Sequence, residues 1–281
     1  MGTGERRLKR LIVTADDFGI SEPVNAAIED AHRNGILTAT CLMVSGAAAA
    51  DAVARAKDMP RLGVGLHVVV VCGRPILPAA LVPDLVDDDG CFDDNLVRAG
   101  FRYFFLPAVR AQLAMEIRAQ FEAFAETGLP LDHVNAHNHM HVHPTVLSLI
   151  LRIGREFGLR AIRVPWEPPA DGAPVSLGES FVGAWIGRLR RRAERAGIRV
   201  NDRIYGVRDS GRMDRDTLLP ILRHLPDGVS EVVTHPATGR WPDIDAAAHD
   251  YHFEAEYKAL LDGEVRAALA GADLISFRDI P

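Results

Sequence analysis

Four histidines at alternate positions are the feature of this sequence that points most directly to chemistry. They are His137, His139, His141 and His143, and the segment leading into them contains Asp132, His133 and Asn135. In an extended segment alternate side chains share one face, so the tract predicts several imidazoles grouped together. Crowded imidazoles are costly to bury without a metal ion or a carboxylate nearby, so the tract favours a metal site or catalysis over an exposed polar loop.

Two adjacent carboxylates, Asp16 and Asp17, follow an apolar run near the start of the chain. In a turn after a strand they can point in different directions, so that one binds a metal while the other acts as a base. Aspartate at such a place is also common as a helix N-cap or in an Asx-turn. The Asp-Phe-Gly motif that begins at Asp17 is not that of a protein kinase, because no glycine-rich loop precedes it and no His-Arg-Asp segment follows.

His67 ends the run Leu62-Gly-Val-Gly-Leu-His67 and could be a core histidine with its hydrogen bonds satisfied. With Asp17 and His137 it would instead give one carboxylate and two imidazoles, with coordination positions left open. That set suits a catalytic Zn²⁺ or another divalent ion. Such an ion lowers the pKa of bound water and polarises a carbonyl group, while a nearby carboxylate takes the proton of the water.

Arg163 and His235 are two further candidates. Arg163, in Arg-Val-Pro-Trp, could brace the free carboxylate and keep it ionised, because an adjacent cation lowers the pKa of an acid. His235, in Thr-His-Pro, could donate a proton to a leaving nitrogen. The alternatives are a surface ion pair for Arg163 and a simple turn residue for His235.

These residues are spaced along a regular alternation of β-like and helical stretches. The clearest helix is expected over residues 22–34, with Ser21 as its cap and Gly35 as its stop. Strands are expected over residues 8–15, 37–44, 62–70, 131–137 and 159–164, with weaker candidates over 203–207, 229–234 and 273–277. The alternation predicts an α/β fold, a TIM-like (β/α) barrel of about seven or eight strands. The candidate residues fall at the carboxyl ends of these strands, where barrel active sites are built.

One barrel domain is expected over residues 1–281, with loop insertions near 70–107 and 167–200. The first insertion ends in an aromatic cluster, and the second contains an arginine-rich helix. Both would lie at the barrel mouth, where loops carry substrate recognition. The apolar stripe of the helix contains Phe181, Val182, Trp185, Ile186 and Leu189, and its arginines lie largely away from it. Such a helix could rest on an anionic membrane or could be an ordinary outer helix of the barrel.

The composition limits the partners and the location. A formal net charge of −6 gives no reason to expect a nucleic acid as partner. The three cysteines form no C-x-x-C pair, which argues against a disulfide framework and a cysteine zinc site. Neither a signal peptide nor a run of about 18 apolar residues is found. A cytoplasmic location is expected, with contact to the inner membrane left open, and a homodimer is allowed but not required.

With these residues assembled, the chain resembles the YdjC/ChbG family of carbohydrate deacetylases over nearly its whole length. The motifs that carry the resemblance are Thr14-Ala-Asp-Asp-Phe-Gly19, Gly65-Leu-His67, the tract from His137 to His141 and Thr234-His-Pro236. The resemblance implies a (β/α) barrel that removes the N-acetyl group from an amino sugar. It also implies one divalent metal ion, zinc or magnesium, held by Asp17, His67 and His137.

Related deacetylases further imply Asp16 as the general base, Arg163 as the residue that orients it, and His235 as the general acid. His137 and His141 have the His-x-x-x-His spacing that polysaccharide deacetylases use for metal, so His141 could join or replace a ligand. The residues expected around the metal or the substrate are Asn135, His139, His141 and Trp166.

Within the family, the chain is most similar to the members associated with hopanoid biosynthesis (HpnK). The similarity lies in the tract 135–143, in Arg163-Val-Pro-Trp-Glu-Pro-Pro169 and in the arginine-rich helix. It implies a lipid-linked substrate, N-acetylglucosaminyl bacteriohopanetriol, which would be deacetylated to the glucosaminyl form. The aromatic cluster over residues 101–106 could cover such a lipid or could be part of the core.

Other functions remain open at this point. Soluble chitooligosaccharides are an alternative substrate for a deacetylase. The same Asp/His/His set also fits a non-haem iron oxygenase, although the adjacent Asp16 and the barrel context favour hydrolysis. A histidine-rich module that binds metal or carbohydrate without catalysis is a third class.

Overall fold

The computed structural model describes residues 8–169, 176–242, 244 and 246–281. The strands are β1 (Lys9–Phe18), β2 (Ala39–Leu42), β3 (Gly63–Val68), β4 (Val134–Ala136), β5 (Ala161–Ile162), β6 (Arg199–Val200), β7 (Arg203–Tyr205), β8 (Gly228–Thr234) and β9 (Ala272–Leu274). The α-helices are α1 (Glu22–Asn34), α2 (Ala49–Lys57), α3 (Leu96–Phe105), α4 (Pro107–Glu126), α5 (Pro144–Gly154), α6 (Leu177–Arg195), α7 (Arg215–Arg223), α8 (Phe253–Leu261) and α9 (Gly263–Ala268). Short 3₁₀ segments are η1 (Ala79–Leu81), η2 (His137–Val142), η3 (Arg155–Phe157), η4 (Ala246–Ala248) and η5 (Phe277–Asp279).

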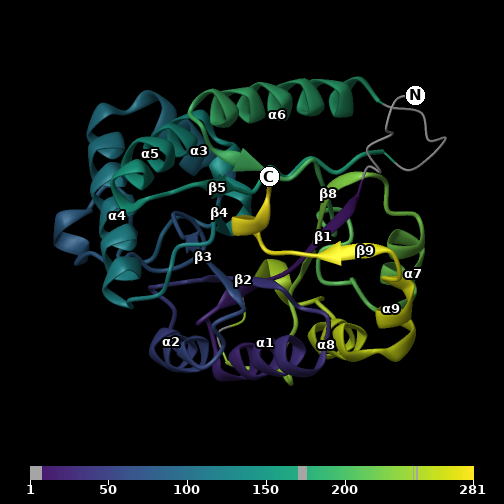
Figure 1. Cartoon of the computed structure of the whole chain (residues 1–281). Coiled ribbons are helices and arrows are strands. Elements are labelled where there is room, and N and C mark those ends of the chain that lie inside the picture. Colours follow the sequence, from purple (N-terminus) through teal and green to yellow (C-terminus); the bar gives the residue numbers. More distant parts are fainter. Residues whose placement is uncertain (1–7, 170–175, 243, 245) are drawn as a thin grey trace.

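The strands form one curled parallel sheet surrounded by helices (Figure 1). Their order is β6-β5-β4-β3-β2-β1-β8-β7, and β9 pairs with β1 beside this row. The two ends of the row, β6 and β7, are separated in sequence only by Asn201 and Asp202. The row therefore curls until its ends meet in one segment of chain, and the predicted TIM-like (β/α) barrel is confirmed.

The central strand β1 is buried along most of its length. Residues 11–15 of β1 are fully buried, because both of its faces are covered by protein. Helix α1 follows with the predicted bounds. The Ser21 side chain accepts a hydrogen bond from the Val24 N–H at its start, and Gly35 ends it.

Several strand boundaries differ from the prediction. Strand β1 does not end at Ala15 but continues to Phe18, with a register shift against β2 between Ala15 and Phe18. Strands β2 to β5 are shorter than predicted. The last candidate, over residues 273–277, instead gives β9 from Ala272 to Leu274, because Ser276 forms a capping box with Asp279 and begins η5.

The prediction that the histidine tract is extended is wrong. Residues His137–Val142 form η2, and Asn138 and His139 have positive φ angles of 50° and 52°. The chain must turn here from β4 into α5, which begins at Pro144 directly after the extended residue His143. The four imidazoles therefore do not share one face.

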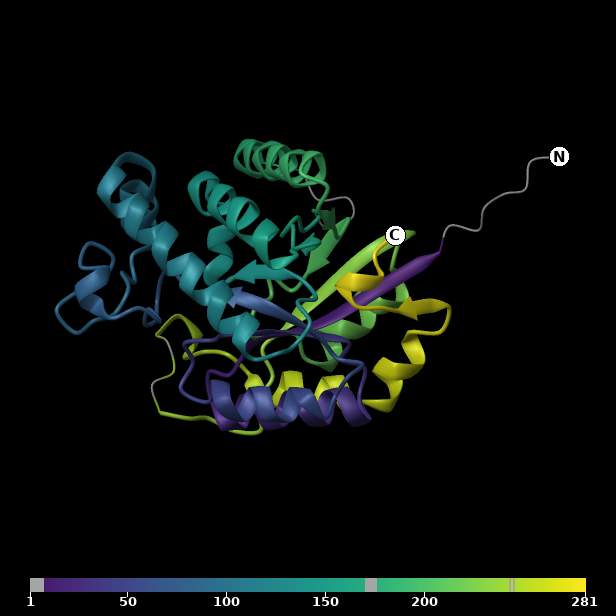
Figure 2. The same cartoon turned by 60° about the vertical axis from the view of Figure 1, so that its left-hand side comes forward.

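The two segments expected as insertions contain helices α3 and α6. Figure 2 shows the blue segment around residues 70–106 projecting beyond the sheet. Helix α6 starts with a capping box between Ser176 and Glu179. Among the described residues, no helix is both long and apolar enough to span a lipid bilayer.

Candidate metal centre and active site

Asp17, His67 and His137 come from the carboxyl ends of β1, β3 and β4, and each directs one donor atom toward the other two. Asp17 Oδ1 lies 3.3 Å from His67 Nε2 and 3.3 Å from His137 Nδ1, and the two nitrogens are 3.3 Å apart. Donor atoms that share a divalent ion at about 2.0–2.2 Å stand roughly 3.0–3.6 Å from one another. The triangle therefore has the size that one such ion requires.

Asp17 occupies a strained and electrostatically unusual position. Its φ angle of 66° lies in the left-handed region, which aspartate tolerates better than most residues. Its buried Oδ1 has no hydrogen-bond partner among the described residues, although both imidazoles are close. Burial opposes ionisation, yet His137 and His67 hold the pKa of the Asp17 carboxyl well below its usual value. A site that binds a cation typically presents such an ionised oxygen, without a hydrogen-bond donor of its own, beside two ring nitrogens.

The tautomer of His67 is set by Asn135. His67 Nδ1 lies 2.7 Å from Asn135 Oδ1, so this nitrogen carries the proton and donates it to the amide oxygen. The lone pair of His67 Nε2 is consequently free to face Asp17 and His137. Metal-binding histidines are typically oriented by such a second hydrogen bond. Asn135 therefore lies next to the triangle, as expected, and contacts the His67 nitrogen that faces away from Asp17 and His137.

Asp16 lies beside the triangle, and Arg163 binds both of its carboxylate oxygens. Arg163 Nη1 lies 2.6 Å from Asp16 Oδ2, and Nη2 lies 2.8 Å from Oδ1. Arg163 is only 1% exposed, so the alternative of a surface ion pair is wrong. Burial raises the pKa of Asp16, but the charge and hydrogen bonds of Arg163, together with His67 and His235, lower it well below its usual value, so the carboxyl is ionised.

Glu231 of β8 completes this ion cluster and was not among the predicted residues. Its Oε1 accepts hydrogen bonds from Arg163 Nε at 2.9 Å and from the Thr14 hydroxyl at 2.9 Å. The guanidinium group is therefore held between two buried carboxylates. Glu231 is the one charged residue in the run Val229-Ser-Glu-Val-Val233, and a charge inside a buried strand is the signal that could have identified it.

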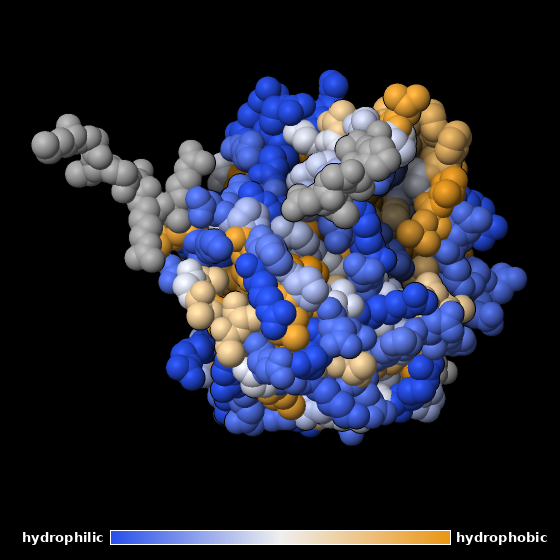
Figure 3. Space-filling model, turned by 90° about the vertical axis from the view of Figure 1, so that its right-hand side faces the viewer, coloured by the Kyte–Doolittle hydropathy of each residue, from blue (hydrophilic) through white to orange (hydrophobic). Residues whose placement is uncertain are grey.

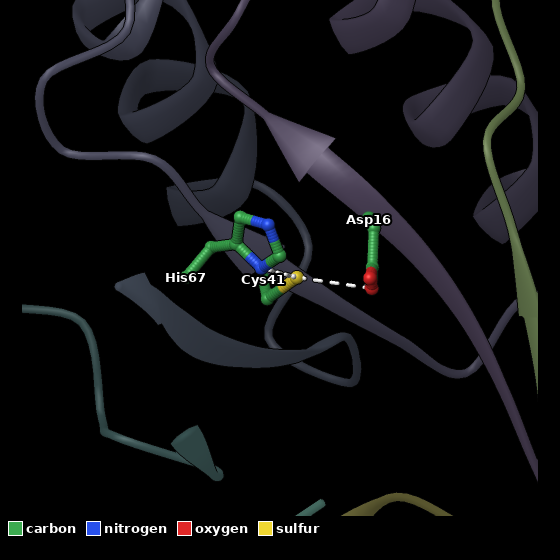
Figure 4. A group of neighbouring side chains, drawn as sticks. All are labelled: Asp16, Cys41 and His67. Carbon is green, nitrogen blue, oxygen red and sulfur yellow. Dashed lines mark hydrogen bonds between the residues drawn. The ribbon is translucent and has the colours of Figure 1, made fainter. Parts of the chain in front are cut away.

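Cys41 of β2 was also missed, and no spacing in the sequence marks it. Figure 4 shows its thiol between the Asp16 carboxylate and the His67 ring, with Sγ 3.2 Å from Asp16 Oδ1 and 3.1 Å from His67 Nδ1. Burial and the neighbouring Asp16 raise the pKa of the Cys41 thiol well above its usual value. The donor atoms of Asp16, Cys41 and His67 also lie close enough together to share a metal ion. This second group suits a metal less well than the triangle, because a protonated thiol is a poor ligand and Asp16 is already held by Arg163.

A cavity of about 230 Å³ opens over the triangle. Its polar lining comes from Asp16, Asp17, His67, His137, Asn138, His139, Ser210, His235 and Tyr251. Gly206 lies at its edge with a φ angle of 98°, and a Cβ there would stand 2.5 Å from the Val233 carbonyl oxygen. Only glycine lets the chain pass so close to β8.

His235 lines this cavity together with Tyr251. The His235 backbone N–H donates to the buried Glu256 carboxylate, and the His235 ring packs edge-on against Tyr251 with centroids 5.2 Å apart. The Tyr251 hydroxyl lies 2.7 Å from Ser210 Oγ. His235 Nδ1 is buried and has no hydrogen-bond partner among the described residues. His235 is therefore fixed by its backbone and its ring face, and its Nδ1 remains available for chemistry.

The remaining predicted residues are divided between the cavity and the core. His139 lines the cavity, and burial lowers its pKa to about 3, so its ring is neutral. His141 is buried against α6 near Leu147 and Ile186. Among the described residues, it belongs to neither of the two groups of side chains whose donor atoms lie close enough together to share a metal ion. Trp166 packs against Gly183 of α6, where a Cβ would stand 2.7 Å from its ring, and it does not line the cavity.

The chain is similar to known proteins over most of its length. A family model described as YdjC-like protein matches residues 10–271. A carbohydrate deacetylase of Geobacillus stearothermophilus is 31% identical over 271 residues, which cover 95% of this chain and 96% of that protein. A carbohydrate deacetylase of Brevibacillus brevis is 41% identical over 160 residues, but these cover only 56% of this chain and 60% of that protein.

Among solved structures, a candidate cellobiose-phosphate cleavage protein of Enterococcus faecalis superposes with a TM-score of 0.72. It is 24% identical in sequence, and the superposition covers 96% of this chain and 98% of that one. At this identity the likeness bears on the fold alone.

Proposed function

This chain belongs to the YdjC-like family, and from that premise we propose that it is a metal-dependent hydrolase that removes the N-acetyl group from an amino sugar. The observation that carries the proposal is the triangle of Asp17, His67 and His137 at the floor of a cavity, with the ionised Asp16 beside it. The carbohydrate deacetylases among the relatives support the choice of reaction.

Asp17, His67 and His137 would hold one divalent ion, zinc or magnesium. Two imidazoles and one carboxylate favour zinc, because magnesium prefers oxygen ligands. When bound, such an ion lowers the pKa of water and polarises the carbonyl group. A carboxylate of very low pKa is a weak base, and it needs water acidified in this way in order to take a proton from it. The hydrogen bond from His67 Nδ1 to Asn135 directs His67 Nε2 toward this position.

Asp16 is the base in this proposal. Arg163 fixes the direction of its carboxylate and keeps it ionised, and Glu231 in turn holds Arg163. After water attacks the acetyl carbonyl carbon, the proton passes to Asp16 and the C–N bond breaks. His235, held at the cavity wall by Glu256 and Tyr251, donates a proton to the leaving nitrogen, so that a free amine and acetate result.

The amino sugar in this proposal is linked to a lipid, as N-acetylglucosaminyl bacteriohopanetriol. The resemblance of the segments 135–143 and 163–169 to the HpnK members supports this choice. Exposed aromatic side chains of α3 also support it, since apolar groups gathered on a surface usually mark a binding site. Soluble chitooligosaccharides are the alternative substrate.

Acetate release by the full chain tests the proposal. The purified protein is incubated with N-acetylglucosaminyl bacteriohopanetriol and, separately, with N-acetylglucosamine oligomers. We expect equal amounts of acetate and free amine from the lipid, loss of both after chelation, and recovery with added zinc.

The outcomes separate the competing functions. No acetate from either substrate, with metal bound stoichiometrically, would refute hydrolysis. Acetate from the oligomers alone would retain the deacetylase and refute the lipid substrate. Iron found after anaerobic purification, with oxygen consumed during turnover, would instead support the oxygenase.

A further inference from the structure

Two helices beside the candidate site expose large apolar side chains to solvent. On α3 these are Val97, Phe101, Phe104 and Phe105, and on α6 they are Leu177, Phe181 and Val182; together they are called the apolar ridge below. Phe101 is 66% exposed and Phe181 is 72% exposed. Figure 3 shows hydrophobic side chains gathered near the upper right edge of the molecule, at the height where Figure 1 places α6. Apolar groups gathered in this way usually mark a binding surface.

The two parts of the ridge are joined by the segment that follows the histidine tract. The Phe104 ring lies edge-on to His143 with centroids 6.2 Å apart, and the Trp185 indole N–H of α6 donates to the Val142 carbonyl oxygen at 3.1 Å. Phe181 lies one helical turn before Trp185. Val142 ends η2, the short segment that begins with His137 directly after the carboxyl end of β4, and His143 follows it, so the ridge lies on the same side of the barrel as the candidate site.

A row of arginines continues the ridge along α6. Arg188, Arg192 and Arg195 lie within about 40° of Phe181 around the helix axis, so they share its exposed face. All three are exposed, and among the described residues none of them forms an ion pair. The exposed face of α6 is thus apolar in its first half and cationic in its second, on a chain whose net charge is −6.

This arrangement fits the surface of an anionic bilayer. Exposed aromatic and aliphatic side chains enter the boundary between headgroups and acyl chains, while arginines beside them attract anionic headgroups. A protein partner with an apolar face would leave the arginine row without a counterpart unless it were also acidic. The sequence pattern alone indicated the helix α6 as a membrane candidate, and the structure adds the aromatic side chains of α3.

We propose that the apolar ridge and the arginine row of α6 together dock this protein on an anionic lipid bilayer. When the protein is docked in this way, the mouth of its cavity lies beside the membrane. The cavity then receives an amino sugar whose lipid part remains in the bilayer. The delivery of substrate rests on the proposed function, whereas binding to a bare bilayer does not.

Co-sedimentation of the full chain with vesicles tests the docking surface. The vesicles are phosphatidylcholine with and without phosphatidylglycerol, and no substrate is present. We expect binding only to the anionic vesicles, and binding that weakens with salt. The variant Phe101→Asp/Phe181→Asp should bind at least tenfold more weakly, and Arg188→Gln/Arg192→Gln/Arg195→Gln about a hundredfold more weakly.

Leu274→Asp is the matched control. Leu274 is also an exposed apolar residue, but it lies in β9 beside the amino end of β1, at the opposite end from Asp16 and Asp17. Wild-type protein that fails to pellet with anionic vesicles, or ridge variants that pellet like Leu274→Asp, would overturn the proposal. A wild-type dimer in light scattering that Phe101→Asp/Phe181→Asp dissociates would also overturn it, in favour of a second copy as the occupant.

Activity on soluble N-acetylglucosamine oligomers keeps this test separate from the proposed function. Whatever rate the wild type has on these oligomers, the ridge variants should match it, because no ridge residue lines the cavity. Vesicle binding without any deacetylation would leave the docking surface in place and refute the enzyme activity alone.

Discussion

Asn135 links the two sides of the site through a single amide group. Its oxygen accepts from His67, while its nitrogen lies 3.3 Å from Asp16 Oδ1 and 3.3 Å from Cys41 Sγ. A candidate metal ligand and the candidate base are therefore oriented by the same residue. Changes at Asp17 and at Asp16 should nevertheless have different effects, because the two carboxylates point into different environments.

Replacing Asp17 by alanine should abolish metal binding together with activity. The variant removes the only carboxylate of the triangle and leaves two imidazoles, so the affinity for zinc should fall by more than the roughly 10–100-fold that loss of a supporting residue costs. Metal content after gel filtration, measured by mass spectrometry, checks this. Full occupancy in the variant would remove Asp17 from the ligands.

Replacing Asp16 by asparagine should separate metal binding from turnover. The amide cannot take a proton, so the turnover rate should fall roughly 10²–10⁴-fold, whereas the triangle is untouched and zinc should remain bound. Acetate release and metal content are measured on the same preparation. A thermal melt checks that the variant remains folded, because the buried Arg163 loses its carboxylate partner Asp16. Near-normal turnover would place the base elsewhere.

At the level of secondary-structure elements, the sequence predicted which strands carry the site but not the shape of their ends. The apolar runs before Asp16, His67 and His137 made the strands visible. The positive φ angles of Asp17, Asn138 and His139 leave no such pattern, because they result from the turn that the barrel imposes. The alternation argument for the histidines failed for this reason. Cys41 was missed because long-range packing alone brings it to Asp16, whereas Glu231 could have been identified as a charge inside a buried strand.

Asn138 allows the geometry of η2 to be tested at a position with an exposed side chain. Asn138→Val should lower the free energy of unfolding by about 1–3 kcal/mol, because a β-branched residue is strained at a φ angle of 50°. Asn138→Gly is the matched control and should be neutral or slightly stabilising. Urea denaturation measures both, and zinc titration should show weakened binding in the valine variant alone, since it displaces the adjacent His137. Equal behaviour of the two variants would show that the backbone strain is unimportant.

At the level of the whole molecule, the end of the barrel opposite the site is closed by the C-terminal segment. Asp132 is buried there and accepts hydrogen bonds from the Phe277 N–H at 3.2 Å and the Arg278 N–H at 3.1 Å. Its carboxylate also lies 3.0 Å from His133 Nδ1. Asp132, which precedes the histidine tract, thus ties the last residues of the chain to the barrel rather than lining the cavity.

This role predicts how stability changes with pH. Burial opposes ionisation of Asp132, but His133 and the N–H donors lower its pKa below the usual value. A carboxyl group with a lowered pKa in the folded state stabilises that state above the unfolded pKa of about 3.9, and this contribution is lost as the pH falls below it. Asp132→Asn should therefore be less stable than the wild type by about 1–3 kcal/mol at pH 7, and the difference should shrink steadily below about pH 4. Urea denaturation of both metal-free proteins between pH 7 and pH 3 measures this difference, and a gap that stays constant over that range would show that the charge of Asp132 does not hold the C-terminal segment.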